Sequence, residues 1–216
     1  MTTPIHRTSP KGTQRAILYF IRYITVDITL VKKIKQNPIS EENVMESLKI
    51  VADLMAVSAR TAPKSAGKDF VSIKIVDGED IKRLADEMFK YGEESGKKNF
   101  DRDGRNVQNS PYVILIGIKD AEHPGLDCGS CGFETCIERD NALPIDSEFK
   151  GPQCAFRLLD LGIAIGSAVK TASILNVDNR IMYRIGVAAR KMGLVEWDVV
   201  MGIPISATGK NIYFDR

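Results

Sequence analysis

YVILIGI, residues 112–118, decides the fold, because this stretch is continuously apolar and rich in β-branched side chains. A strand of that composition is typical of the centre of a sheet that is covered on both faces. Upstream, FVSIKIV (70–76) alternates apolar and polar residues and predicts a second strand. Downstream, WDVVMGIPI (197–205) predicts a third buried strand, which ends near Gly202 and Pro204.

The apolar residues in the segments around these strands recur at helical spacing, which predicts helices there. Ser40 is suited to cap a helix that runs to about Arg60 and stops at Pro63. A second helix follows the turn at residues 77–78, and residues 155–176 and about 178–192 predict two more. The stripes expected to be buried are Val44, Leu48, Val51, Leu54 and Met55 in the first helix, and Ile81, Leu84, Ala85, Met88 and Phe89 in the second. This order predicts an α/β (α+β) sandwich with a mixed or parallel sheet flanked by helices.

The predicted organisation has four parts. Residues 1–40 form an N-terminal arm, partly disordered; 41–120 form the first part of the α/β body; 121–154 form a cysteine-rich insert; and 155–216 form the second part of the body. The apolar stretch at 16–31 is interrupted by Arg22 and Asp27 and is shorter than the roughly 18 uncharged residues that a spanning helix needs. We therefore expect it to pack on the body or on a partner subunit, with no membrane association.

The composition argues against nucleic acid as a partner and indicates the redox state of the compartment. The 30 Lys and Arg residues nearly balance the 28 Asp and Glu residues, for a net charge of +2, so the chain lacks the basic character of a nucleic-acid-binding protein. All four cysteines fall within residues 128–154, which leaves no disulfide framework. That pattern favours a reducing compartment, with the cytoplasm as the expected location.

LDCGSCGFETC (126–136) holds three of the four cysteines, and the full spacing is Cys128-x2-Cys131-x4-Cys136-x17-Cys154. Four thiolates can hold a tetrahedral zinc ion or an iron–sulfur cluster. Structural zinc sites usually offer two closely spaced pairs, whereas three ligands in one loop and a distant fourth are typical of a 4Fe–4S cluster. The pattern favours the cluster, and zinc stays an alternative. Gly129 and Gly132, each after a ligand, are expected to turn backbone N–H groups towards the cluster.

The three-cysteine loop (residues 126–136) resembles the CGxCGxxxC motif of a small cluster domain found in anaerobic redox proteins, including corrinoid iron–sulfur proteins. Four longer segments extend the resemblance: ADLMAVSARTAPKSAGKDF (52–70), RNVQNSPYVILIGIKD (105–120), the stretch at 151–193 and GIPISATGKNIYFDR (202–216). From about residue 44 to its C-terminus the chain is similar to an uncharacterised bacterial and archaeal family described as ferredoxin-domain-containing proteins. The first 40 residues lie outside that resemblance.

The body also resembles flavin-dependent nitroreductases. SARTAPKSAG (58–67) is similar to their segment that contacts FMN, the helix at 155–176 to their central helix, and GKNIYFDR (209–216) to a basic tail near the phosphate. The resemblance implies a nitroreductase-like fold, FMN as a second cofactor and a homodimer. It assigns Arg60, Lys64 and Ser65 to the FMN, with Lys210 or Arg216 as a second phosphate contact. The SGNxQP pattern of nitroreductases is absent here, and the alternative in which Arg60 and Lys64 cap a helix stays open.

Two kinds of function are consistent with these patterns. The first is an iron–sulfur oxidoreductase or electron-transfer protein, which takes an electron from a redox partner protein and passes it to a cofactor or small-molecule substrate beside residues 162–168. The alternative is a non-enzymatic interaction or redox-sensing protein, or a zinc-stabilised scaffold. No catalytic residue is assigned, because the sequence offers neither a Ser-His-Asp arrangement nor a complete phosphate-binding loop. His123 and the polar stretch at 102–110 are expected to lie in solvated loops.

Overall fold

The computed structural model describes residues 39–214, so the apolar stretch at 16–31 and Arg216 lie outside the described residues. The chain divides into two compact units, Met1–Glu41 and Glu42–Arg216, and the second contains the sheet and the four cysteines. Within the described part, no helix combines the length and the apolar character that crossing a membrane requires.

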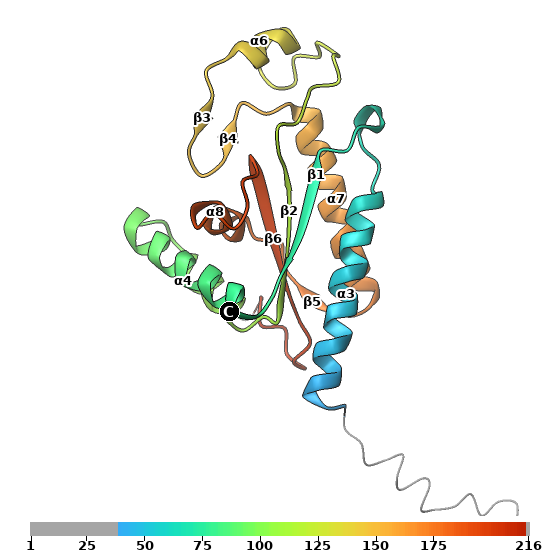
Figure 1. Cartoon of the computed structure of the whole chain (residues 1–216), viewed down its shortest axis with the longest axis vertical. Coiled ribbons are helices and arrows are strands. Elements are labelled where there is room, and N and C mark those ends of the chain that lie inside the picture. The colour runs from blue at the N-terminus through green and yellow to red at the C-terminus, as the bar shows by residue number, and fades with distance from the viewer. Residues whose placement is uncertain (1–38, 215–216) are drawn as a thin grey trace, which may run out of the picture. The chain divides into compact units, whose positions relative to one another are not determined.

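A four-stranded sheet in the order β1-β2-β6-β5 forms the middle layer (Figure 1). The strands are β1 (Val71–Val76), β2 (Tyr112–Ile118), β6 (Val199–Ser206) and the short β5 (Asp178–Asn179). YVILIGI is β2, which pairs with β1 on one side and with β6 on the other. Every residue of β2 after Tyr112 is buried, which confirms the prediction of a central strand covered on both faces.

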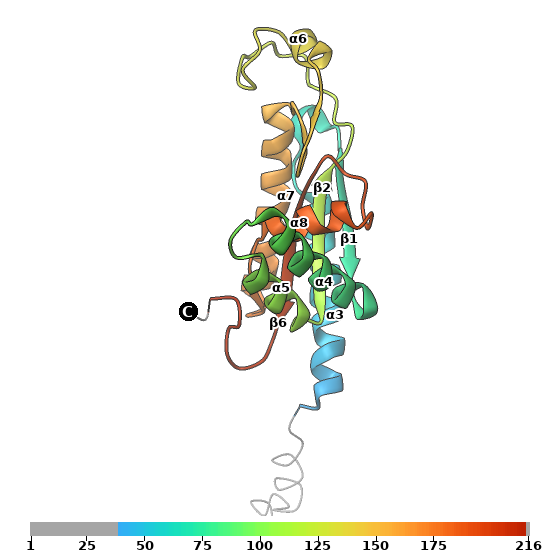
Figure 2. The same cartoon turned by 90° about the vertical axis from the view of Figure 1, so that its left-hand side faces the viewer.

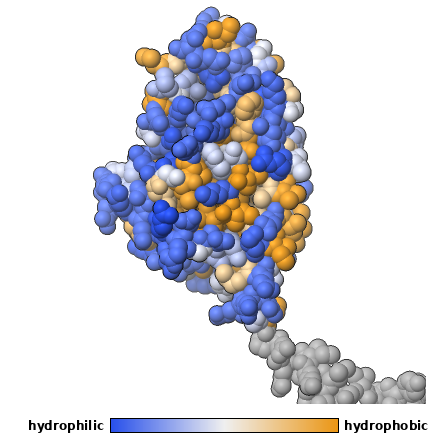
Figure 3. Space-filling view, in the orientation of Figure 1, coloured by the Kyte–Doolittle hydropathy of each residue, from blue (hydrophilic) through white to orange (hydrophobic). Residues whose placement is uncertain are grey.

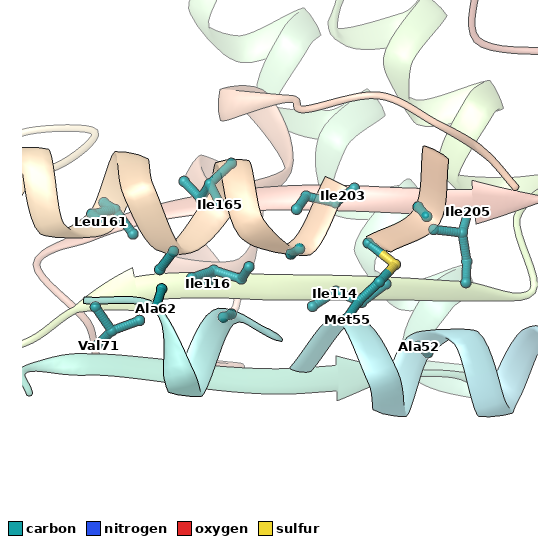
Figure 4. Close-up of a cluster of buried hydrophobic side chains, with 14 of the residues drawn as sticks. Ala52, Met55, Ala62, Val71, Ile114, Ile116, Leu161, Ile165, Ile203 and Ile205 are labelled. Carbon is teal, nitrogen blue, oxygen red and sulfur yellow. The ribbon is translucent and has the colours of Figure 1, made fainter. Parts of the chain in front are cut away.

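Helices cover both faces of this sheet (Figure 2). One layer contains α3 (Glu41–Thr61) and α7 (Ala155–Ile174), and the other contains α4 (Gly78–Ser95), α5 (Phe100–Gln108) and α8 (Tyr183–Lys191). Alternate residues of β2 supply the two cores: Ile114 and Ile116 pack on the α3 and α7 side, and Leu115 packs on the other. Figure 4 shows Ile114 beside Met55 of α3, with Ile116 further along β2.

The structure confirms the α+β sandwich with flanking helices, but the prediction of a mixed or parallel sheet is wrong for the described strands. Their ladders are all antiparallel. The reason lies in α5, a helix whose residues were expected to lie in solvated loops. Because two helices, α4 and α5, connect β1 to β2, the chain returns to the end where β1 finished, and β2 runs back beside it.

Two smaller predictions also need correction. Leu54 was expected in the buried stripe of the first helix, yet it is 44% exposed, because Leu48, Val51, Ala52, Met55 and Ala59 are the residues that α3 buries. The helix expected from residue 178 begins at Tyr183, since residues 178–179 pair with β6 as strand β5.

The insert (residues 121–154) lies between β2 and α7 and extends from one end of the sandwich (Figures 1 and 2). It contains α6 (Cys136–Asn141) and a small hairpin of β3 (Ile145–Asp146) and β4 (Lys150–Gly151). The short 3-10 helix η1 (Ser65–Gly67) lies at the same end of the sandwich, against α7.

A buried ion pair fastens the insert to the body. Arg157, in the first turn of α7, is fully buried; its Nη1 lies 2.8 Å from Asp160 Oδ2 and donates to the Ser65 carbonyl at 2.9 Å. Its Nε donates to the Glu122 carbonyl at 2.6 Å, and its guanidinium lies over the Phe70 ring. Asp160 in turn accepts from the N–H and hydroxyl of Ser65 at 2.8 Å each. One pair thus joins η1, the start of the insert and α7.

We expect Arg157→Met to lower the free energy of unfolding by about 3–5 kcal/mol, because it leaves the buried Asp160 carboxylate without its cation. Urea unfolding followed by circular dichroism measures the change. Arg105→Met is the matched control: Arg105 pairs with Asp101 on an exposed face of α5, where the loss should stay within about 1 kcal/mol. Equal effects of the two substitutions would contradict the role given to Arg157.

Candidate metal centre

The four cysteines line one cavity. Cys128, Cys131 and Cys136 come from the three-cysteine loop and Cys154 from the residue before α7, and the cavity that they line has a volume of about 10 Å³. The other lining residues are His123, Pro124, Leu126, Gly129, Phe133, Thr135, Arg139, Ala155 and Phe156. All four thiols are free. We call this space the cysteine cavity.

Exposure of the four cysteines changes across the cavity. Cys128 is exposed, Cys131 is half-buried, and Cys136 and Cys154 are buried. The solvent side of the cavity is therefore the loop, and its inner side is the start of α7. A group held by all four sulfurs would bridge the surface and the body of the protein.

Glycines allow the loop to turn tightly around the cavity. Gly129 and Gly132 have φ angles of 73° and 89°, in the left-handed region that side chains disfavour. The Gly132 N–H donates to the Gly129 carbonyl at 2.9 Å, which closes the turn between Cys128 and Cys136. Open space surrounds both Cα atoms, so the conformation, and not crowding, requires glycine there.

Cys136 is held at the first position of α6 by two devices. The Asp127 carboxylate accepts from the Cys136 N–H at 2.7 Å, and this hydrogen bond lowers the pKa of Asp127 below its usual range. Thr135 and Glu138 form a capping box, in which the Glu138 N–H donates to the Thr135 hydroxyl at 3.2 Å. The loop is thereby closed on itself before any ligand is bound.

Cys154 takes its position from α7, the helix that it precedes. Its carbonyl accepts from the N–H groups of Arg157 and Leu158 at 3.0 and 3.1 Å, so it is the N-cap residue of a 20-residue helix. Because Arg157 lies one turn further on, the buried ion pair also sets where Cys154 meets the insert.

Ser130 acts on the most exposed of the four sulfurs. Its backbone N–H and its hydroxyl both hydrogen-bond the Cys128 sulfur, and they lower the pKa of that thiol below its ordinary value. A lowered pKa increases the thiolate fraction at neutral pH, and the thiolate is the form that binds metal.

His123 lies in the wall of the cysteine cavity with both ring nitrogens in use. Nδ1 accepts from the Gly125 N–H at 2.9 Å, and Nε2 lies 3.1 Å from Asp140 Oδ2. Asp140 also pairs with Arg139, which lines the same cavity. These contacts make His123 a structural residue of the wall, more ordered than the solvated loop position that the sequence suggested.

A polar cleft of about 630 Å³ adjoins the cysteine cavity and shares His123 and Arg139 with it. Its walls come from the insert, from Asp120 just before it and from Asp198 just before β6. The charged residues among them are Asp120, Glu122, Arg139, Asp140, Lys150 and Asp198. Sequence reasoning missed this cleft, because residues as far apart as Asp120 and Asp198, 78 positions from each other, form it and no local motif marks them. The charged residues at 119–122 and 146–150, near the two ends of the insert, were the available signal.

Two of the residues assigned to FMN by resemblance have internal partners. The Lys64 ammonium donates to the carbonyls of Ala59 and Arg60 at 2.9 and 2.6 Å, so it caps the C-terminus of α3. Ser65 donates its N–H and its hydroxyl to the buried Asp160. The capping alternative describes the present contacts of Lys64.

Arg60 lies beside Lys64, and both side chains approach the Asp69 carboxylate. Arg60 donates to Asp69 and to the Val71 carbonyl at 2.8 and 3.0 Å. Lys210 is exposed beyond the end of β6, and Arg216 lies outside the described residues. Of the described residues in this set, none of Arg60, Lys64, Ser65 and Lys210 lines the cysteine cavity or the adjoining cleft.

Relatives of this chain identify its family. A family described as "Uncharacterized protein containing a ferredoxin domain (DUF2148)" matches residues 150–216, a stretch that includes Cys154. An uncharacterized protein of Archaeoglobus fulgidus is 52% identical over 171 residues, which cover 79% of this chain and 92% of the relative. The chain belongs to this ferredoxin-domain family. The similarity to the Archaeoglobus fulgidus protein covers 171 residues, whereas the family match covers only residues 150–216.

Solved structures similar to this ferredoxin-domain protein include nitroreductases. An FMN-dependent nitroreductase, NfnB of Mycobacterium smegmatis, has a TM-score of 0.49 at 11% identity, covering 76% of this chain and 81% of that one. A nitroreductase family protein of Clostridium novyi has a TM-score of 0.47 at 14% identity, covering 82% and 81%. NfrA2 of B. megaterium has a TM-score of 0.45 at 14% identity; the similarity covers 82% of this chain and only 61% of NfrA2.

We expect Ser130→Ala to raise the pKa of the Cys128 thiol, because the substitution removes the hydroxyl that hydrogen-bonds the sulfur and leaves only the backbone N–H. In metal-free protein, alkylation of Cys128 by iodoacetamide, followed by mass spectrometry against pH, should show its midpoint at higher pH. Ser147→Ala, in the hairpin of the insert, is the control and should leave the midpoint in place. An unchanged midpoint in Ser130→Ala would contradict the hydrogen bond.

Proposed function

We propose that the chain is an iron–sulfur redox protein that holds a 4Fe–4S cluster on Cys128, Cys131, Cys136 and Cys154 and transfers electrons through it. The observation that carries the proposal is that four free cysteines from two separate segments line one cavity. The chain has no other cysteine, so its entire supply of thiolates converges there.

The donor set fits a cluster better than a single zinc ion. Within residues 39–214, no three or more His, Cys, Asp or Glu side chains are arranged to hold one metal ion. A zinc ion needs its ligands packed around one centre, whereas each thiolate of a 4Fe–4S cluster binds a different iron. The spacing, three cysteines in one loop and a fourth 18 positions later, carries the preference for the cluster.

The residues around the cavity have different roles in holding the cluster. Asp127 and the capping box fix Cys136, and Gly129 and Gly132 bend the loop. Cys154 supplies the ligand that belongs to the rigid body. A bound cluster supplies one-electron transfer. Because Cys128 is exposed and Cys154 is buried, we assign electron exchange with a partner to the Cys128 side.

The adjoining cleft supports the oxidoreductase form of the proposal, in which a small polar substrate binds beside the cluster. His123 and Arg139 belong to both spaces, so a molecule in the cleft would be separated from the cysteine cavity by one layer of side chains. The other lining charges have both signs, which suits a polar substrate. Four free thiols fit a reducing compartment, and the proposal places the protein in the cytoplasm.

FMN does not fit the residues as they are arranged. Lys64 and Ser65 already donate to backbone carbonyls and to Asp160, and Arg60 to Asp69, so a phosphate would have to displace internal partners. FMN binding stays a prediction from the resemblance to nitroreductases, and no step of the proposed function depends on it. Retention of flavin after anaerobic purification tests it directly.

Anaerobic purification followed by metal and sulfide analysis tests the cluster. We expect iron and acid-labile sulfide in equal amounts and a broad visible absorption that bleaches with dithionite. Cys154→Ser should lose most of the iron, because it removes the ligand that comes from the body. Ser173→Ala, on the exposed side of α7, is the control and should retain it. Stoichiometric zinc without sulfide would replace the proposal with the zinc-stabilised scaffold.

We further propose that the chain forms a homodimer through the outer surface of α3 and α7. On α7, Gly162 and Gly166 face open space, with no atom near the position of an added Cβ. Leu159 and Ile163 beside them are 57% and 45% exposed, and Val57 of α3 is 58% exposed. Figure 3 shows apolar side chains along this side of the molecule. Apolar residues around two helical glycines permit close packing of a second copy.

Ile163→Glu should convert the dimer to a monomer, since it places a charge in the centre of that surface. Size-exclusion chromatography with light scattering measures the mass. Ile181→Glu is a matched control, because Ile181 is also 45% exposed but lies outside α3 and α7. A wild-type chain that runs as a monomer would contradict the homodimer.

A further inference from the structure

The insert carries a negative charge that the rest of the chain does not share. Its seven carboxylates outnumber its two cationic side chains, so residues 121–154 have a net charge of −5 within a chain of net charge +2. The carboxylates are Glu122, Asp127, Glu134, Glu138, Asp140, Asp146 and Glu148, and the cations are Arg139 and Lys150. Such a surface repels nucleic acid and anionic lipid, and it attracts a cationic protein.

The unpaired part of this charge lies at the tip of the insert (residues 126–143). Four of the seven carboxylates face cations in the described chain: the pairs are Glu122–Lys68, Asp140–Arg139, Asp146–Arg190 and Glu148–Lys97. Asp127 and Glu138 accept hydrogen bonds from backbone N–H groups instead. Glu134 is exposed between them.

Large apolar side chains stand among these carboxylates. Leu126, Ile137 and Leu143 are 54%, 68% and 89% exposed, and Leu143 is the most exposed large apolar side chain of residues 39–214. Leu126 also lines the cysteine cavity next to Cys128. Figure 3 shows single apolar side chains within a hydrophilic surface at this end. Three such side chains in 18 residues, two of them in or beside a cysteine loop, favour an interface.

We propose that the tip of the insert is the docking surface for a redox partner protein whose contact face is basic around an apolar centre. The inference rests on the proposed function and adds the partner's chemistry to it. The apolar side chains supply the desolvated contact, and the carboxylates orient the partner over Cys128. Charge complementarity mainly raises the association rate, which suits a small and transient redox interface.

Location supports the same assignment. The tip contains Cys128, the most exposed ligand position, and it lies at the end of the sandwich opposite the start of α3 (Figure 1). The described residues outside the insert, 39–120 and 155–214, carry a net charge of only +1, so the insert is the part of them that would attract a basic partner. A cationic partner would therefore approach the chain where the thiolates are nearest the surface.

A basic c-type cytochrome and the same cytochrome with succinylated lysines serve as matched probes. Biolayer interferometry should show binding of the native probe alone, weakening about tenfold as salt rises from about 0.01 M to about 0.15 M and the screening length falls. Glu134→Lys should weaken that binding by about fivefold, because it reverses a charge at the tip. Glu46→Lys makes the same change of total charge on exposed α3 and should have little effect.

Electron transfer separates this inference from the proposed function. If dithionite-reduced protein reduces a neutral small-molecule acceptor but binds neither cytochrome, the cluster stands and the docking surface is wrong. If the native cytochrome binds in the predicted way and no acceptor is reduced, the docking surface stands and the cluster is wrong. If Glu134→Lys and Glu46→Lys weaken cytochrome binding equally, the binding depends on the total charge of the protein and not on the tip. That result would overturn the inference. Self-association abolished by Glu134→Lys would assign the tip to a second copy and also overturn it.

Discussion

The buried pair of Arg157 and Asp160 is the constraint on which the rest of the structure depends. A buried cation is costly unless it is paired and hydrogen-bonded, and the Nε and Nη1 atoms of Arg157 meet this requirement through carbonyls that belong to η1 and to the start of the insert. The pair therefore selects one arrangement of three chain segments that are far apart in sequence. Cys154 lies one turn away from Arg157, so the same arrangement determines how the body meets the cysteine loop.

The candidate site combines a rigid ligand with an organised loop. Cys154 belongs to the start of a 20-residue helix that packs against the central strand. The other three cysteines belong to a loop that is closed by its own hydrogen bonds, through Asp127, Thr135 and Glu138. The gradient of exposure from Cys128 to Cys154 gives a group held by all four sulfurs one accessible side, on which the acidic and apolar tip lies.

Much of this fold could be predicted from the sequence, because apolar periodicity dictates which residues are buried. YVILIGI became the central strand with the predicted bounds, and the helices at 41–61 and 155–174 match their periodic segments closely. The helix α5 could not be recognised, because its buried stripe includes Asp103, whose charge is satisfied by Arg102 and Arg184. Arg184 comes from a distant part of the chain. Missing α5 also caused the wrong strand direction, since one helix implies a parallel neighbour and two imply an antiparallel one.

In the site, as in the fold, locally encoded features could be predicted and contacts between distant segments could not. Spacing grouped the four cysteines, and the structure places all four around one cavity; their role as ligands stays a prediction. The contacts of Lys64 and Ser65, the two hydrogen bonds of His123 and the cleft beside the cavity depend on residues that fold together from separate segments.

X-ray absorption at the iron and zinc edges of anaerobically purified protein tests the central claim most directly. The account predicts iron with sulfur ligands and short iron–iron distances. A zinc edge with four sulfur neighbours and no iron would contradict it.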